Sequence, residues 1–102
     1  MAVKKYCVSP EEKAYKLGDA LNETGGIIGS YIKKDELLQR EGGIYDLGGA
    51  VVIAEGYFKN YTACSIIGTE REIKSAKSKL EKLCGIKLKA VKNDKETFSG
   101  GF

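Results

Sequence analysis

The strongest constraint on the fold is a helix pattern that occurs twice with the same length. Residues 9–12 (Ser-Pro-Glu-Glu) form a potential capping box, and residues 69–72 (Thr-Glu-Arg-Glu) repeat it. A glycine follows sixteen residues after each cap, at Gly25 and at Gly85, where a left-handed residue ends a helix. The sequence therefore predicts two helices of equal length. The second carries an apolar stripe of Ile73, Ala76, Leu80 and Leu83.

Apolar segments typical of strands flank each predicted helix. These four segments are residues 2–8, 26–33, 61–67 and 86–92. A further strand is expected over residues 50–58, where Gly56 marks a bulge or a point of close packing. The unit β-α-β thus occurs twice, either through a duplication or through convergence on the same helix pattern.

Two β-α-β units in one chain of 102 residues are typical of one ferredoxin-like domain. We expect an α+β sandwich, with an antiparallel sheet and both helices on one face. The expected boundaries are 1–93 for the domain, 2–33 and 50–93 for its two halves, 34–49 for an insert between them, and 94–102 for a flexible C-terminal tail. Within the insert, residues 34–40 are expected to form a short helical turn that ends at residues 41–43, and residues 44–47 are expected to add a short strand.

The hairpin that joins the two central strands has two alternative turns. A turn at Lys59-Asn60 pairs residues 50–58 with 61–67, and a turn at Glu55-Gly56 is the competing register. Both strands are apolar at even and at odd positions, so we expect both faces of the hairpin to be buried. Either the insert or another subunit would cover the second face, and we expect a homo-oligomer, most simply a dimer.

Missing residue types exclude whole classes of mechanism. The chain contains no histidine, which rules out Ser–His and Cys–His catalysis and histidine-ligated metal sites. The acidic residues between 35 and 46 do not follow the spacing of a calcium loop. We therefore expect neither an enzyme nor a cofactor or metal site. No apolar run is long enough to span a membrane, so no membrane partner is expected.

Three cysteines occur without the CxxC spacing of zinc or redox sites. An odd number of cysteines indicates a reducing compartment, and we expect the protein to be cytoplasmic. Cys64 lies inside a predicted strand and Cys84 at the C-terminal end of a predicted helix, where burial and the helix dipole disfavour a thiolate. Cys7 precedes the N-terminus of the first predicted helix and is the candidate reactive thiol.

Two groups of side chains are candidate binding sites. Tyr57, Phe58 and Tyr61 surround the predicted hairpin turn and form the expected face for a ligand or partner. Residues 69–102 carry nine Lys/Arg against five Asp/Glu, which makes the last third of the chain basic. The candidate basic patch consists of Lys74, Lys77, Lys82, Lys87 and Lys89.

We expect a small non-enzymatic interaction or regulatory module. It would homo-oligomerise and bind a protein partner or a small ligand through the face or the edge of its sheet. The alternative is a protein that binds single-stranded nucleic acid, with lysines on the phosphates and aromatic rings stacked on the bases. Among the seventeen cationic residues Arg40 and Arg71 are the two arginines, which disfavours base reading.

Overall fold

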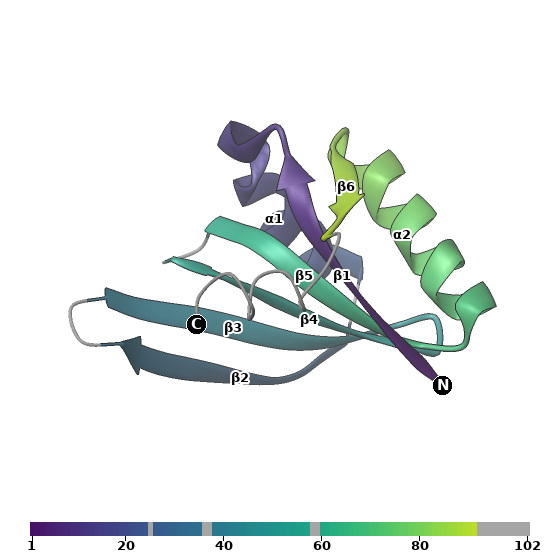
Figure 1. Cartoon of the computed structure of the whole chain (residues 1–102), viewed down its shortest axis with the longest axis horizontal. Coiled ribbons are helices and arrows are strands. Elements are labelled where there is room, and N and C mark those ends of the chain that lie inside the picture. The colour runs from purple at the N-terminus through teal and green to yellow at the C-terminus, as the bar shows by residue number, and fades with distance from the viewer. Residues whose placement is uncertain (25, 36–37, 58–59, 92–102) are drawn as a thin grey trace, which may run out of the picture.

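The computed structural model describes residues 1–24, 26–35, 38–57 and 60–91. Their elements are, in chain order, β1 (Ala2–Ser9), the 3₁₀ helix η1 (Glu11–Lys13), α1 (Tyr15–Thr24), β2 (Gly26–Asp35), β3 (Leu38–Leu47), β4 (Ala50–Tyr57), β5 (Asn60–Gly68), α2 (Glu70–Cys84) and β6 (Lys87–Ala90). The strands form one antiparallel sheet in the order β2-β3-β4-β5-β1-β6 (Figure 1). More than half of the described residues lie in this sheet.

The predicted ferredoxin-like arrangement of two β-α-β halves is wrong. The strands β2, β3, β4 and β5 follow one another as neighbours in a meander, and β1 lies on the far side of β5. Because of this order, α1 connects two strands, β1 and β2, between which three other strands lie. The second connection differs, since β5 and β6 are separated by β1 alone. The two helices therefore sit in different connections and do not define two equivalent halves.

The strand order differs from the predicted one because the segment 34–49 is part of the sheet and is not an insert. Its described residues form the end of β2, the whole of β3 and the turn at Gly48-Gly49, and β3 pairs with β2 on one side and with β4 on the other. The expected helical turn over residues 34–40 is absent from the described part of that range, which is strand. A two-residue turn at Gly48 and Gly49, with φ of 61° and 90°, then leads directly into β4.

Two consecutive glycines do not interrupt β3 because aromatic rings cover them. A Cβ atom at Gly42 would collide with the ring of Tyr31, and one at Gly43 would lie 2.7 Å from the ring and the hydroxyl of Tyr45. An aromatic ring laid over a strand glycine replaces the packing that the glycine lacks. The strand therefore continues through the position where the sequence predicts a break.

The second predicted helix is confirmed together with both of its caps. The hydroxyl of Thr69 accepts a hydrogen bond from the Glu72 N–H at 3.2 Å, and the Glu72 carboxylate accepts one from the Thr69 N–H at 2.9 Å. At the other end Gly85 takes the left-handed conformation, with φ of 63°, and its N–H bonds to the carbonyl of Glu81. These local signals are sufficient to define α2.

The cap predicted at Ser9 is wrong. Ser9 is the last residue of β1 and pairs with Lys87 of β6, so its backbone is part of the sheet. Pro10 follows in an extended conformation without a side-chain cap bond, and η1 precedes α1, which begins at Tyr15. The predicted C-terminal residue of this helix, Gly25, lies outside the described residues.

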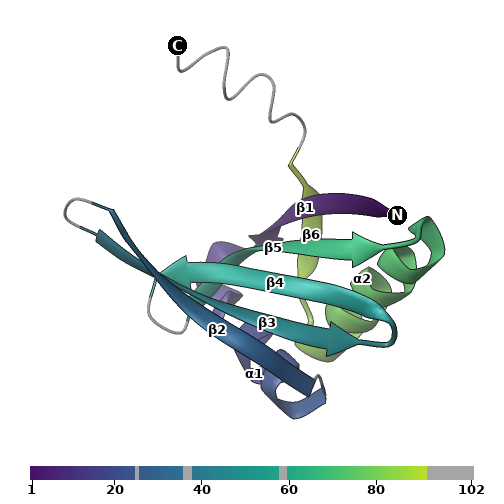
Figure 2. The ribbon, with the colours of Figure 1, turned by 90° about the horizontal axis from the view of Figure 1, so that it is seen from below.

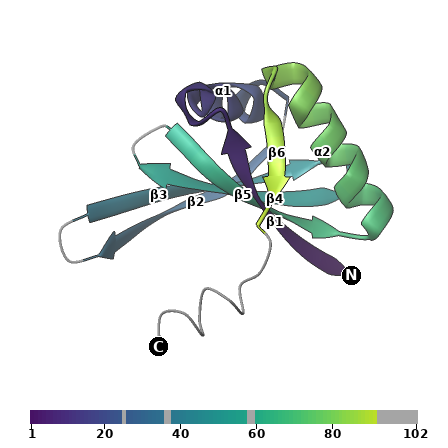
Figure 3. The same cartoon turned by 45° about the horizontal axis from the view of Figure 1, so that its top comes forward.

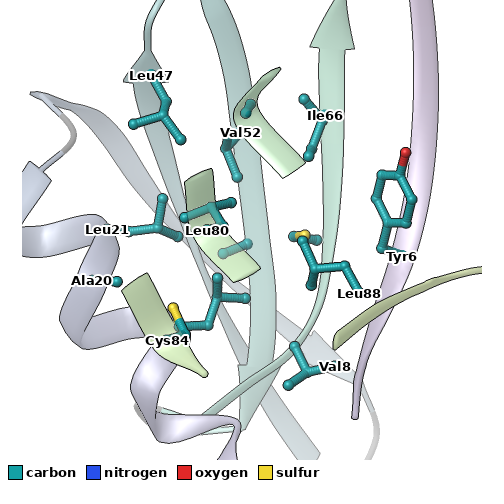
Figure 4. Close-up of a cluster of buried hydrophobic side chains, with 14 of the residues drawn as sticks. Tyr6, Val8, Ala20, Leu21, Leu47, Val52, Ile66, Leu80, Cys84 and Leu88 are labelled. Atoms are coloured by element: carbon teal, nitrogen blue, oxygen red, sulfur yellow. The ribbon is translucent and has the colours of Figure 1, made fainter. Parts of the chain in front are cut away.

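The core lies between the two helices and the sheet (Figures 3 and 4). Its largest fully buried side chains are Leu17 and Leu21 of α1, Ile73 and Leu80 of α2, Tyr45 of β3, Val52 of β4, and Cys64 and Ile66 of β5. Leu83 was expected in this core, yet its side chain is 51% exposed. Cys84 takes that place, because a residue four positions after Leu80 returns to the same side of the helix.

The register of the β4–β5 hairpin excludes one of its two predicted turns. Tyr57 pairs with Asn60, and Glu55 and Gly56 lie inside β4, so the turn at Glu55-Gly56 is wrong. The expected close packing at Gly56 is confirmed, because a Cβ atom there would collide with the carbonyl oxygen of Asn60. The register also shifts between Glu55 and Gly56, as expected for a bulge. Of the other predicted turn, Asn60 is the first residue of β5 and Lys59 lies outside the described residues, as does the predicted tail 94–102.

Candidate interaction surfaces

One surface of the sheet is turned away from the two helices, and Figure 2 shows it from that side. We call it the open face; by strand register it comprises Val3, Lys5 and Cys7 of β1, Tyr31 of β2, Ile44 of β3, Val51, Ile53 and Glu55 of β4, and Ala63, Ser65 and Ile67 of β5. The side chains on β4 and β5 are half-buried, and Val3 is 63% exposed. Full burial of both hairpin faces, as the sequence predicts, is therefore not reached within the described residues.

Both oxygens of the Glu55 carboxylate on the open face contact a neighbouring side chain. The Tyr31 hydroxyl donates a hydrogen bond to Glu55 Oε2 at 2.9 Å, and Arg40 Nη1 lies 3.7 Å from Glu55 Oε1. Burial, followed by the bond to Glu55, raises the pKa of Tyr31 to about 12. The phenol therefore stays protonated at neutral pH and acts as the donor. This cluster ties β2, β3 and β4 together.

The two outer edges of the sheet differ strongly. The edge strand β6 has four residues, and its Lys87 and Lys89 are exposed. The other edge strand, β2, has ten residues, and no described strand pairs with its outer side. Its isoleucines at positions 27, 28 and 32 are 60–64% exposed. Short length and lysines are the usual protection of a strand edge, and β2 lacks this protection over residues 26–32.

Of the three residues of the predicted aromatic face, the structure describes the side chain of Tyr61. Tyr61 is partly buried and packs against the core. It also lies beside Tyr45, whose pKa is raised to about 12 mainly by burial and further by the Tyr61 hydroxyl. Tyr57 ends β4 opposite Asn60, and Phe58 lies outside the described residues.

The structure places the five predicted lysines in different surroundings. Lys77 pairs with Glu81 at 3.9 Å and lies 5.8 Å above the ring of Tyr6. Lys82 and Lys87 line one cavity, between the end of β1 and the end of α2. Lys89 pairs in register with Cys7. Lys74 lines a separate cavity with two cations that were not predicted.

This separate cavity lies between β1 and the first turns of α2 and has a volume of about 550 Å³. We call it the basic cavity; it is lined by Lys4, Tyr6, Glu70, Arg71, Ile73 and Lys74. Sequence reasoning missed Lys4 and Arg71 because β1 is nearly seventy residues away from α2 in the chain. The available signal was alternation, which places Lys4 and Tyr6 on the same side of β1.

The three cysteines are free and differ in access. Cys7 is exposed, whereas Cys64 and Cys84 are buried. Burial raises the pKa of Cys64 to about 12 and also raises that of Cys84. The Cys84 thiol donates to the carbonyl oxygen of Lys16 at 3.5 Å. Cys7 lies within β1 rather than at a helix N-terminus, so its exposure is the feature that supports the prediction of a reactive thiol.

Among the described residues no group of three or more Cys, Asp or Glu side chains is placed to hold a metal ion. Neither α1 nor α2 is long and apolar enough to cross a membrane, and they are the α-helices of the described ranges. The described residues thus form a small α+β protein with an unprotected sheet edge at β2 and a basic cavity between β1 and α2. No protein family model, curated protein or solved structure matches the chain.

Proposed function

We propose that the protein is a non-enzymatic interaction module that self-associates through the outer edge of β2. The observation that supports this is the row of exposed isoleucines on a ten-residue strand whose outer side pairs with no described strand. Such an edge presents free backbone N–H and C=O groups beside apolar side chains, which favours the addition of another strand. The opposite edge, β6, is short and carries exposed lysines, so the asymmetry points to β2 as the pairing edge.

The charges around β2 favour a second copy of the same chain as the added strand. Lys33 and Lys34 lie near the C-terminal end of β2, with Asp35 as its last residue. At the other end, Gly26 pairs with the exposed Asp46 of β3, and the exposed Glu23 precedes β2 in α1. Antiparallel pairing of two copies places the lysines of each opposite the acidic end of the other. A parallel arrangement would place like charges together.

A pair of substitutions on β2 tests this proposal. The double variant Ile28→Lys/Ile32→Lys introduces charge into the apolar edge and should convert an oligomer into a monomer in size-exclusion chromatography with light scattering. The matched control is Leu83→Lys, which places the same charge at an exposed leucine of α2 and should leave the mass unchanged. A monomeric wild type at high micromolar concentration, or equal dissociation of the control, would contradict the proposal.

Three free cysteines support a reducing compartment such as the cytoplasm for this module. Binding of single-stranded nucleic acid stays a prediction. The separation of Lys89 from Lys74 and the packing of Tyr61 against the core give it less support than a continuous patch with free rings would. Binding of a protein partner to the open face likewise stays a prediction.

A further inference from the structure

The basic cavity collects three cations from two elements that are distant in the sequence. Lys4 comes from β1, and Arg71 and Lys74 lie one turn apart on α2. None of the three forms an ion pair within the described residues, in contrast to Lys77, which pairs with Glu81. Glu70 also lines the cavity, so the cations outnumber the carboxylate three to one. An electropositive cavity of this kind attracts a multiply charged anion.

A second and independent feature is the hydroxyl of Tyr6. The side chain is 5% exposed, and its hydroxyl forms no hydrogen bond with a described residue. No buried side-chain oxygen of the described residues lacks a partner, so this hydroxyl is accessible, and Tyr6 is one of the residues that line the basic cavity. Figure 4 shows its oxygen pointing away from the neighbouring core side chains Val8 and Leu88.

The Tyr6 hydroxyl is suited to donate a hydrogen bond. Burial raises its pKa, and Cys64 and Glu81 raise it further, so the phenol keeps its proton at neutral pH. A ligand in the cavity can accept a hydrogen bond from this hydroxyl, which has no partner among the described residues. The unpartnered donor and the three cations therefore belong to residues that line the same cavity.

We propose that the basic cavity binds the phosphate group of a small phosphorylated molecule. The guanidinium of Arg71 offers a planar pair of donors for two phosphate oxygens, and Lys4 and Lys74 supply point charges. The Tyr6 hydroxyl donates a further hydrogen bond, and Ile73 gives an apolar wall for the rest of the molecule. The proposal does not depend on self-association through β2.

The size of the cavity favours a small molecule over a nucleic acid. Its volume of about 550 Å³ lies within the range of roughly 300–1,000 Å³ that small-molecule sites occupy. Tyr61, which the sequence predicts to stack on bases, is not among the residues that line it. A phosphodiester chain would instead need a track of cations along the surface.

The test is an NMR titration of the ¹⁵N-labelled full chain with inorganic phosphate and with glucose 6-phosphate, and with glucose as the uncharged comparison. We expect saturable shifts at the amides of Lys4, Arg71, Ile73 and Lys74 for both phosphate probes and none for glucose. Arg71→Gln should weaken binding on the order of tenfold, since it removes a bidentate charge-assisted contact. Tyr6→Phe keeps the ring packed and should weaken it about fivefold.

The control is Lys79→Gln, which removes an exposed cation from the same helix outside the cavity. An unchanged affinity in this variant supports a built site. Equal weakening in Lys79→Gln and Arg71→Gln, or shifts that never saturate, would reduce the observation to general charge attraction and overturn the proposal. A single-stranded oligonucleotide that binds more tightly than glucose 6-phosphate and loses binding in Arg71→Gln would also overturn it and assign the cavity to nucleic acid.

Discussion

The hydroxyl of Tyr31 on β2 donates a hydrogen bond to the carboxylate of Glu55 on β4, although β3 lies between these two strands. The residue of β3 between them is Gly42, which pairs with both Tyr31 and Glu55 in register. Because Gly42 has no side chain, the tyrosine ring lies across it and reaches the next strand. The hydrogen bond between Tyr31 and Glu55 on the open face therefore depends on the absence of a Cβ atom at Gly42.

Gly42→Ala should therefore destabilise the fold. The new methyl group collides with the Tyr31 ring, and overpacking of this kind costs about 1–3 kcal/mol of unfolding free energy. Urea denaturation measures the loss. Gly26→Ala is the control, because a Cβ atom at Gly26 meets nothing within 4 Å. In the double variant Tyr31→Ala/Gly42→Ala the combined loss should be smaller than the sum of the two single losses, and strict additivity would contradict the contact.

Stability should fall when the pH rises from about 10 to 12. The pKa of Tyr31 and that of Tyr45 are raised from 10.0 to about 12 in the folded state. The unfolded chain loses these protons first, so deprotonation favours unfolding above pH 10 and has no such effect below it. Denaturation midpoints measured along this range should decline less steeply in Tyr45→Phe. Tyr15→Phe, which alters an exposed tyrosine, should keep the wild-type slope.

The two predicted helix caps should respond differently to alanine. Thr69→Ala removes the acceptor for the Glu72 N–H and should cost about 1 kcal/mol of unfolding free energy, within a usual range of roughly 0.5–2 kcal/mol. Ser9→Ala is the matched substitution at the position that resembles a cap in sequence but lies in β1. It should cost clearly less, and equal losses in thermal or urea unfolding would show that Ser9 caps α1 after all.

Thiol labelling of the native protein should single out Cys7. Cys7 is exposed, whereas burial restricts access to Cys64 and Cys84 and raises the pKa of both thiols. Mass spectrometry after a short exposure to a maleimide reagent should find one modified site. Addition of urea should then expose the other two cysteines to the reagent. Rapid labelling of Cys64 without denaturant would contradict the described core.

The helix α2 could be predicted from the sequence because its signals are local. Thr69, Glu72 and Gly85 lie within or next to the helix and determine its ends through bonds to nearby residues. For β3, the sequence predicts a strand over residues 44–47 alone, whereas the structure extends it over Leu38–Leu47. The glycines at 42 and 43 indicate a break when they are read alone, and the rings that cover them come from Tyr31 on β2 and from Tyr45. Once β3 forms, the meander follows and the ferredoxin-like order is lost.

The candidate surfaces also depend on contacts between distant segments, which local sequence patterns do not indicate. The basic composition of the last third of the chain indicated Lys74 as a binding residue. Lys4 lines the same cavity, and it is placed there by the pairing of β1 with β5. The isoleucines of β2 indicate an apolar strand but not its position in the sheet. Whether a strand lies at the edge depends on the order of all the strands. Pairing between distant segments is therefore the information that local patterns lacked.

The neighbouring glycines of β3 have different aromatic partners, Tyr31 for Gly42 and Tyr45 for Gly43. By strand alternation these partners lie on opposite faces of the sheet. Positions 42 and 43 are therefore under separate evolutionary constraints, although they are adjacent in the chain. In descendants of this sequence, a side chain at position 42 requires a smaller residue at position 31, and one at position 43 requires a smaller residue at position 45, with each pair free to change while the other is kept.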